Sequence, residues 1–392
     1  MIAIFQMRAG GRAMDASDSA TIAVPGPSGP WRRIKREWFL AIAVLTCAIY
    51  VLFGDVIFAS LGNYLTLGLV FVWLFAVVIG SALGVVRHAE AISRRLGEPY
   101  GTLVLTLSIT AIEVMSITAV MLHGENNPTL LRDTMFSVVM ILMGGTIGLS
   151  LLLGALRHRE QSINLQGANA YLGVIVPLAV LSMVLPDFTS TTDGPTLSLV
   201  QQIMLGTIAG GLYFTFLLIQ TGRHRSYFTQ PDAVERAEEQ ASGALPLHFG
   251  LLLAYIVPVV LLVEQLARPI DYVIETLGAP HMVGGVMVAI LVATPEGIGG
   301  IKAALRNELQ TSVNVFLGGV LATIGLTVPI MLVLAHMLGL DLILGLQSSN
   351  LVLLMLMLAV SVITFSSGRT NLLQGAVHLL LFGAFLILLF EG

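Results

Sequence analysis

Two acidic residues lie inside long apolar segments, where a charged group has no water to solvate it. Glu113 stands near the centre of an apolar stretch over 103–122, and Glu296 follows Pro295 in a second stretch that is rich in glycine. A carboxylate at such a depth is costly unless a cation or a proton neutralises it, so it is a functional-site hypothesis by default. The two glutamates therefore predict the binding of cations and protons.

Hydroxyl groups recur along the segment that carries Glu113. They belong to Thr106, Ser108, Thr110, Ser116 and Thr118. Carboxylate, hydroxyl and carbonyl oxygens suit calcium and alkali ions rather than zinc. The alternative is that each hydroxyl bonds back to a carbonyl of its own helix, which is the commoner role for any single Ser or Thr.

The surroundings of Glu296 indicate an interrupted helix. Pro295 frees backbone carbonyls, and the glycines that follow let the chain bend; such breaks at membrane depth are tolerated where they line a cavity, and their carbonyls can ligate a cation. The alternative is a tightly packed kink with small residues at a helix contact. The adjacent acidic group favours the functional interpretation.

Further oxygen ligands are expected on the same and the neighbouring segments. The candidates are Thr110, Thr134, Ser137, Thr294, Asn314 and Thr323. For Asn314 an ordinary hydrogen bond between helices is an equal alternative. His336 and His378 lie in or at the ends of apolar segments, where packing with a hydrogen bond is the commoner role and a proton relay the less common one.

Composition places these residues in a membrane protein. Of the 392 residues, 56% are hydrophobic and 11% are charged, whereas soluble domains carry about 25% charged residues. Eleven segments are long enough to span a bilayer. They are 38–58, 62–86, 102–122, 134–155, 168–186, 197–220, 247–266, 280–302, 311–337, 347–367 and 370–390.

The distribution of Lys and Arg predicts the orientation. With the N-terminus in the cytoplasm, 17 of the 19 basic residues fall in the inner connections, and only Arg132 and Arg268 fall in the outer ones. This asymmetry follows the positive-inside rule and leaves the C-terminus in the periplasm.

The expected organisation is a tail, an extra helix and two halves. Residues 1–30 are predicted to be a disordered cytoplasmic tail, 31–61 an extra first helix, 62–220 a first five-helix repeat, 221–246 a polar cytoplasmic linker and 247–392 a second repeat. An offset of five spans reverses direction, so Glu113 and Glu296 lie on oppositely directed helices, as in the inverted repeats of secondary transporters. A Gly-Gly pair follows each glutamate on the next span, within 143–145 and 317–319.

Several motifs of this chain resemble those of the bacterial ChaA-type calcium/proton antiporters, in the calcium:cation antiporter superfamily. The motifs are Leu96-Gly-Glu-Pro-Tyr-Gly-Thr-Leu103, Ile112-Glu-Val114, Pro128-Thr-Leu-Leu-Arg-Asp-Thr134, Gly148-Leu-Ser-Leu-Leu-Leu-Gly154, Pro295-Glu-Gly297, Asn314 to Thr323 and Gly368-Arg-Thr-Asn371. The resemblance implies an eleven-span exchanger in which Glu113 and Glu296 each bind the cation. Where the wider superfamily has Gly-Asn before the glutamate, this chain has Ile109-Thr110 and Val292-Ala293 and so lacks those amide ligands.

We therefore expect an all-α polytopic antiporter of the bacterial inner membrane. It would export calcium, and also sodium or potassium, in exchange for protons, with no cofactor and no nucleic-acid partner. Because no nucleotide-binding loop is present, the energy must come from an ion gradient. Two alternatives stay open: a passive cation channel, which would need a selectivity filter, and an intramembrane enzyme, which would need a nucleophile–base pair or a metal-ligand set.

Overall fold

The computed structural model describes residues 37–97, 100–123, 127–228 and 244–391. The description concerns the compact unit Phe39–Gly392. The predicted tail over 1–30 and most of the predicted linker over 221–246 lie outside the described residues.

The described chain is almost entirely helical. A first helix, α2 (Trp38–Phe58), precedes two runs of elements, which we call the first and second halves. The first half contains α3 (Tyr64–Leu96), α4 (Tyr100–Met121), α5 (Leu130–Val139), η2 (Met140–Thr146), α6 (Ile147–His158), β1 (Gln161–Ser162), α7 (Leu165–Ala179), η3 (Val180–Val184), η4 (Leu185–Phe188), α8 (Leu199–Leu218), η5 (Ile219–Arg223) and η6 (Arg225–Tyr227). The second half contains α10 (Leu245–Asp271), η7 (Tyr272–Thr276), α11 (Met282–Leu305), α12 (Leu309–Ala322), η8 (Thr323–Thr327), α13 (Val328–Leu338), α14 (Ser348–Phe365), β2 (Arg369–Thr370) and α15 (Leu372–Glu391).

The prediction of eleven spans is confirmed. Eleven continuous helical runs among the described residues are long and apolar enough to cross a membrane, and each overlaps one predicted segment. The largest differences are at two ends: the second span continues to Leu96 instead of 86, and the seventh to Thr276 instead of 266. Both extensions contain charged residues, which end an apolar stretch in the sequence without ending the helix.

Helix ends follow local chemistry. Asn63 caps α3 by accepting a hydrogen bond from the backbone of Leu65, and Gly97 ends that helix with a φ of +65°. Ser198 and Gln201 form a reciprocal capping box at the start of α8, which satisfies two backbone groups that would otherwise have no partner. These caps define where α3 ends and where α3 and α8 begin.

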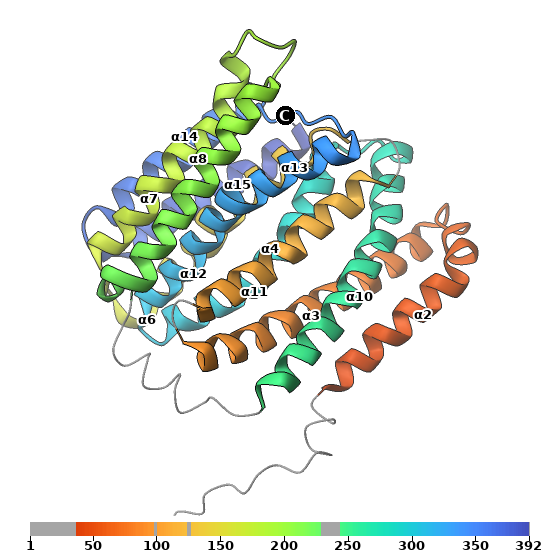
Figure 1. Cartoon of the computed structure of the whole chain (residues 1–392), viewed down its shortest axis with the longest axis horizontal. Coiled ribbons are helices and arrows are strands. Elements are labelled where there is room, and N and C mark those ends of the chain that lie inside the picture. The colour runs from red at the N-terminus through yellow and green to blue at the C-terminus, as the bar shows by residue number, and fades with distance from the viewer. Residues whose placement is uncertain (1–36, 98–99, 124–126, 229–243, 392) are drawn as a thin grey trace, which may run out of the picture. The chain divides into compact units, whose positions relative to one another are not determined.

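The two halves pack against each other through corresponding helices. Their first spans, α3 and α10, lie together along much of their length, with Gly84 of α3 beneath the ring of Tyr255 of α10 (Figure 1). In the next spans, α4 of the first half contacts η8 of the second, and α11 contacts η2 of the first. The packing of each half on the other is thus repeated with the roles exchanged, as two inverted five-helix repeats require.

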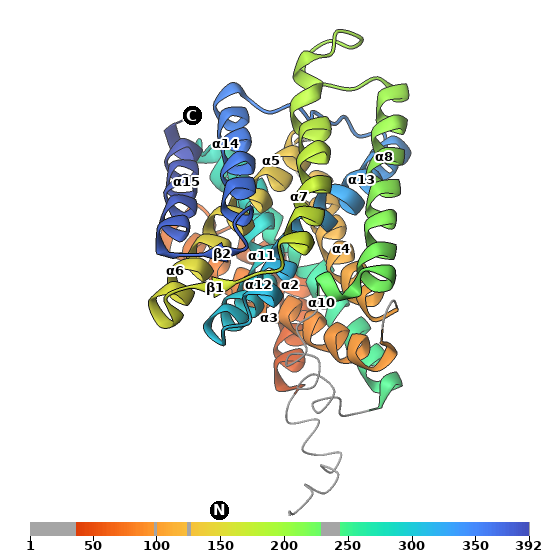
Figure 2. The same cartoon turned by 90° about the vertical axis from the view of Figure 1, so that its left-hand side faces the viewer.

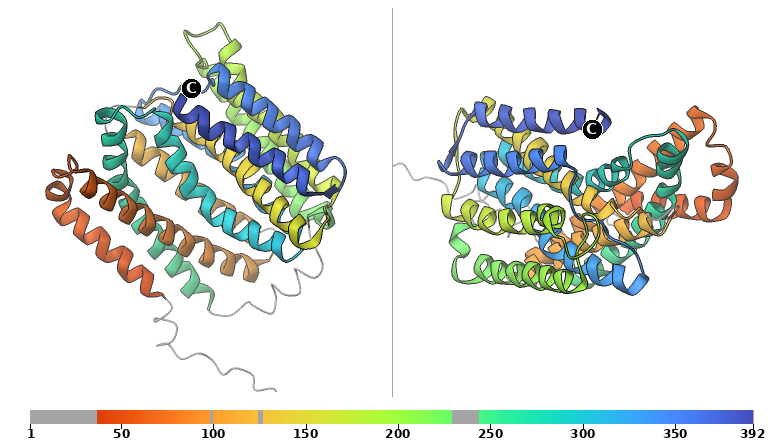
Figure 3. Two further views of the ribbon diagram at one scale, coloured as in Figure 1. Left: turned by 180° about the vertical axis from the view of Figure 1, so that it is seen from behind. Right: turned by 90° about the horizontal axis from the view of Figure 1, so that it is seen from above.

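The two ends of the helix bundle can be distinguished in Figure 2. At one end β1 pairs with β2 in an antiparallel ladder of two residues, with Gln161 opposite Thr370. At the opposite end, here called the C-terminal end, α4, the α10–η7 run and α15 terminate and α5, α11 and α14 begin. Figure 3 shows α2 at the edge of the bundle, beside α3.

The fourth and ninth spans form the centre of the fold. Each is an α-helix interrupted by a π-helical turn, η2 in the first half and η8 in the second. They are also the most buried of the eleven spans. A π-helical turn leaves backbone carbonyls without their usual partners and often marks a functional site. The two interruptions therefore indicate a functional site on corresponding spans of the two halves.

Candidate cation-binding site

Glu113 is buried at the contact of α4 with the second half. Its side chain is 1% exposed, and its Oε2 accepts hydrogen bonds from the hydroxyls of Thr327, at 2.7 Å, and Thr323, at 3.2 Å. Its other oxygen, Oε1, is buried and has no hydrogen-bond partner among the described residues. One oxygen of this carboxylate is therefore held by the opposite half, while the other has unused capacity for a cation or a proton.

Glu296 is held on α11 opposite a glycine. The residue is 9% exposed, and its Oε2 is buried without a partner among the described residues. A Cβ atom placed on Gly319 of α12 would lie 2.7 Å from the carboxyl carbon and closer still to Oε2. Glycine at this position is what allows the carboxylate to lie against the backbone of α12.

The two carboxylates meet along one helical run. Gly319, which contacts Glu296, and Thr323, which contacts Glu113, are four residues apart in the α12–η8 run. Residues at this spacing lie on the same helix face, about 6 Å apart along the axis. Both carboxylates therefore lie against neighbouring turns of the same helical run. Glu113 and Glu296 therefore share one buried site, to which both halves contribute.

An internal repeat in the sequence marks the helices that receive the glutamates. Thr146-Ile-Gly-Leu-Ser150 in the first half corresponds to Thr323-Ile-Gly-Leu-Thr327 in the second. In both places the initial threonine lies in the π-helical turn. This repeat, which our sequence analysis missed, would have identified Thr327 and Ser150. The Gly-Gly pairs are a poorer guide, since one pair lies directly before its threonine and the other four residues before.

Corresponding residues of the repeat form different hydrogen bonds in the two halves. Ser150, the counterpart of Thr327, is 1% exposed, and its hydroxyl has no partner among the described residues. Thr146 donates to the carbonyl of Leu142, and its methyl carbon would be 3.2 Å from a Cβ on Gly297, the residue after Glu296. Hydroxyls of the second half thus bind Glu113, whereas the equivalent hydroxyls of the first half, on Thr146 and Ser150, form no bond to Glu296.

The other ligands expected from sequence fall into three groups. Thr323 binds Glu113 directly. Thr110 and Thr134 are buried with hydroxyls that lack partners among the described residues. Ser137 and Thr294 donate to carbonyls one turn earlier in their own helices, and Asn314 bonds the Phe228 carbonyl and accepts from Gln310. The structure thus places Thr323 at the carboxylates, whereas the polar groups of the last three are already engaged elsewhere.

Replacing Thr327 tests the shorter of the two bonds to Glu113. Because a hydrogen bond to a charged group contributes about 1.5–3 kcal/mol, we expect Thr327→Val to raise the cation concentration for half-maximal exchange roughly tenfold or more. Thr327→Ser, which keeps the hydroxyl, should stay near wild type. Thr207→Val is the control, since that exposed hydroxyl bonds only to its own helix, at Ile203. Equal kinetics for Thr327→Val and Thr327→Ser would show that the hydroxyl plays no part.

His378 of α15 supports the π-helical turn η2. Its ring is fully buried; Nδ1 donates to the carbonyl of Met143 at 2.7 Å, and Nε2 lies 3.0 Å from the Thr364 hydroxyl. A carbonyl can only accept, so Nδ1 carries a proton. His378 therefore ties α14 and α15 to the turn that contains Thr146, which agrees with the packing role considered from sequence.

Loss of this support should lower stability. We expect His378→Leu to reduce the free energy of unfolding by about 1–3 kcal/mol, because the Met143 carbonyl is left buried without its donor. Thermal unfolding in detergent measures the change. His336→Leu is the control, because His336 lies at an exposed position of α13. A melting temperature for His378→Leu equal to that of wild type would contradict the assigned role.

The donor set suits a hard cation. Two carboxylates, threonine and serine hydroxyls and the carbonyls of π-helical turns are oxygen donors, which calcium and alkali ions prefer. Across the described ranges, no group of three or more His, Cys, Asp or Glu residues could hold a metal ion. The carboxylates of Glu113 and Glu296 are the charged members of the donor set.

Comparisons with known proteins identify the family of the chain. The family described as sodium/calcium exchanger protein matches residues 66–222 and 247–391, one segment in each half. The chain is 44% identical to y4hA of Sinorhizobium fredii over 312 residues, 79% of this chain and 85% of the relative. It is 38% identical to the sodium-potassium/proton antiporter ChaA of Escherichia coli over 319 residues, 80% of this chain and 86% of the relative.

Solved structures show the same fold. The structure of native YfkE superposes with a TM-score of 0.68 at 18% sequence identity, covering 90% of this chain and all of that one. The H+/Ca2+ exchanger CAX superposes with a TM-score of 0.64 at 14% identity, covering 90% and 88%. With matching segments in both halves and a fold shared over nine-tenths of its length, the chain belongs to the sodium/calcium exchanger family.

Proposed function

We propose that this chain is a secondary antiporter that exchanges cations for protons, with calcium, sodium and potassium as the transported ions. The observation that carries the proposal is the meeting of Glu113 and Glu296 along the α12–η8 run, where each half contributes one carboxylate. The names of the relatives support the ion classes: ChaA of Escherichia coli is a sodium-potassium/proton antiporter, and ChaA of Bacillus subtilis is a Ca2+/H+ antiporter.

Electrostatics explains why cations and protons would alternate. Two carboxylates about 4–8 Å apart repel each other by on the order of 2–4 kcal/mol at an effective dielectric constant near 20. A divalent cation neutralises both, and protons do the same in its absence. Since both groups cannot stay charged and empty, arrival of one species drives departure of the other.

Glu113 and Glu296 differ in their hydrogen bonds to hydroxyl groups, and this difference can reverse between two conformations of the protein. Thr323 and Thr327 hold Glu113, while Ser150 and Glu296 both have unused hydrogen-bonding capacity. We infer that movement of one half against the other brings the hydroxyls of the first half to Glu296 and opens the site toward the other side of the membrane. This is alternating access around a fixed pair of carboxylates.

The proposed location is the bacterial inner membrane. The chain is a multi-pass membrane protein with eleven candidate spans. The positive-inside distribution supports a cytoplasmic N-terminus and a periplasmic C-terminus. The C-terminal end of the bundle would then face the periplasm.

Two other functions receive less support. A passive channel conducts through a continuous polar path, whereas here the carboxylates are buried between the halves. An intramembrane enzyme is not favoured by membership of a family of exchangers. A fixed ratio of cation to proton flux separates an antiporter from a channel.

Flux in vesicles tests the proposal. The full chain is reconstituted in liposomes that contain a pH-sensitive dye, and calcium, sodium or potassium is added in turn at constant ionic strength. We expect each transported cation to drive protons the opposite way, with a ratio that does not change with the membrane potential. Cation uptake without proton movement would contradict the proposal.

A further inference from the structure

A cavity lies at the C-terminal end of the bundle, apart from the two glutamates. Its volume is about 440 Å³, and η7, α11, the start of α5 and the start of α14 surround it. Gly285 of α11 contacts the backbone at Asp133 beside this cavity, and Glu296 follows eleven residues later. At 1.5 Å per residue the separation along α11 is about 16 Å. The cavity is therefore a different site from the shared carboxylate site.

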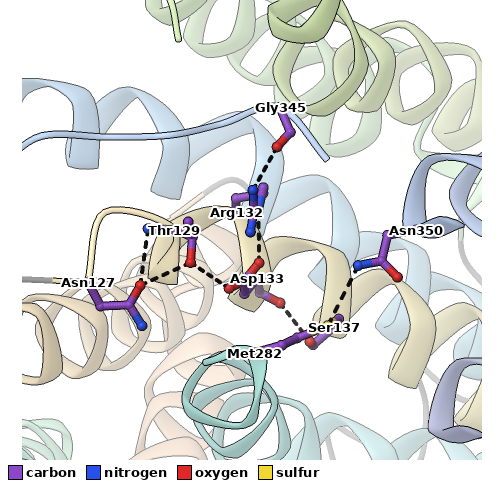
Figure 4. A network of polar contacts seen from close by, with 8 residues as sticks. All are labelled: Asn127, Thr129, Arg132, Asp133, Ser137, Met282, Gly345 and Asn350. Carbon is purple, nitrogen blue, oxygen red and sulfur yellow. Dashed lines mark hydrogen bonds and ion pairs between the residues drawn. The ribbon is translucent and has the colours of Figure 1, made fainter. Parts of the chain in front are cut away.

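The single arginine that lines the cavity is already neutralised. Arg132 donates from Nε to Asp133 at 2.8 Å and from Nη1 to the Gly345 carbonyl at 2.9 Å (Figure 4). The other oxygen of Asp133 accepts from Thr129 at 2.8 Å. Both charged side chains are buried and directed at each other. This pair fastens the start of α5 to the α13–α14 connection and contributes no net charge to the cavity.

Two further carboxylates line the cavity without a cationic partner among the described residues. Asp271 ends α10 and Glu275 lies one turn later in η7. The Oδ2 atom of Asp271 is buried and has no hydrogen-bond partner within the described ranges. The nearest basic residue along that helix, Arg268, is bound to Asp55 at 3.0 Å. The cavity is therefore lined by two neighbouring carboxylates that have no bonded counterion among the described residues.

A buried amide in the lining of the same cavity has few hydrogen-bond partners. Asn350, in the first turn of α14, is 8% exposed and lines the cavity. Its nitrogen contacts only the sulfur of Met282, at 3.7 Å, which is a weak acceptor. No donor from the described residues reaches its oxygen. This amide oxygen lines the same cavity as the two unpaired carboxylates, and it is a separate observation that points to a bound cation.

We propose that Asp271, Glu275 and Asn350 form a second cation site, with calcium as its ligand. Calcium takes six to eight oxygens from carboxylates, amide carbonyls and water in flexible geometry. Two carboxylates, one amide oxygen and the water of a 440 Å³ cavity supply such a set. With few charged ligands the affinity is low, so the site fills and empties readily. The inference goes beyond the exchange activity, because binding here does not require Glu113 or Glu296.

Calcium binding to a transport-inactive variant tests this site separately from the proposed function. The full chain carrying Glu113→Gln and Glu296→Gln is purified in detergent, and radioactive calcium is measured by equilibrium dialysis at pH 8. We expect about one calcium per chain to bind with a dissociation constant in the range of 10⁻⁴–10⁻³ M, as at other weak sites. Adding Asp271→Asn and Glu275→Gln should weaken this binding by about tenfold or more, since calcium affinity follows the number of charged ligands.

Two controls make the result specific. Glu264→Gln in the same background changes an exposed carboxylate of α10 outside the cavity lining, and binding should be unchanged. Asn350→Asp adds a charged ligand and should tighten binding by about tenfold, an outcome that misfolding cannot imitate. Absence of calcium binding in the background variant would overturn the proposal. Binding that is the same with and without Asp271→Asn and Glu275→Gln would overturn it too.

Discussion

Glu113→Gln and Glu296→Gln are each expected to abolish cation-driven proton movement. Glutamine has nearly the shape of glutamate but neither charge nor a titratable proton, so the variant can neither attract a cation nor carry a proton. Loss of one carboxylate from a buried cation site removes several kcal/mol of binding, which corresponds to at least a hundredfold reduction in exchange at a fixed ion concentration. Proton flux in liposomes, with calcium, sodium and potassium tested in turn, measures the effect.

The control for both variants is Glu264→Gln. Glu264 lies in α10, within a membrane span, but at an exposed position. Its replacement makes the same chemical change at a place where the carboxylate contacts neither half of the site, so exchange should continue at the wild-type rate. Full activity of Glu113→Gln would show that the bonds from Thr323 and Thr327 serve only packing. Full activity of Glu296→Gln would remove the shared site altogether.

The expected effects of the two glutamine variants differ in one respect. Glu113 already accepts two hydroxyl bonds, and an amide oxygen in its place can still accept them. Glu113→Gln also removes the repulsion between the two carboxylates, but it weakens these two hydrogen bonds because their acceptor is no longer charged, so its stability should stay near that of wild type. Glu296 has a buried oxygen without a partner among the described residues, so Glu296→Gln relieves electrostatic repulsion and is expected to raise the melting temperature. A lower melting temperature would indicate that Glu296 has an opposite charge near it.

The sequence was sufficient for the spans and the two carboxylates because both depend on local composition. Twenty apolar residues have few alternatives to a membrane helix, and an acidic residue in their midst is conspicuous. The ends of the second and seventh spans were missed, since Arg94 and Glu275 continue a helix that composition alone would stop. The orientation and the boundaries of the repeats stay predictions.

The partners of the carboxylates were harder to predict because they depend on contacts between the halves. Thr323 and Ser137 look alike in the sequence, yet one hydroxyl crosses to Glu113 and the other bonds back to Asp133. Only the opposing helix decides between these outcomes. The π-helical turns follow no simple pattern of residue types, and they set which side of the fourth and ninth spans faces a glutamate. The repeated Thr-Ile-Gly-Leu segments were the available signal.

Gly319→Ala is expected to reduce exchange strongly. The added Cβ would lie 2.7 Å from the carboxyl carbon of Glu296 and 2.8 Å from Oε1. These distances are shorter than any ordinary contact, so the carboxylate must rotate away from α12. Because a displacement of about 1 Å in a positioned group can cost roughly a hundredfold in rate, we expect a loss of exchange of that size.

Gly318→Ala provides a matched control in the neighbouring position. Its Cβ would meet the Tyr171 hydroxyl at 3.6 Å, an ordinary contact. Both substitutions replace glycine by alanine within a helix and gain the same helix propensity, about 1 kcal/mol. Helix propensity therefore does not distinguish the two variants. The difference in exchange between the two variants thus isolates the position of the Glu296 carboxylate. If both transport equally well, Glu296 can act from a second place, and the argument that one helical run aligns the two carboxylates fails.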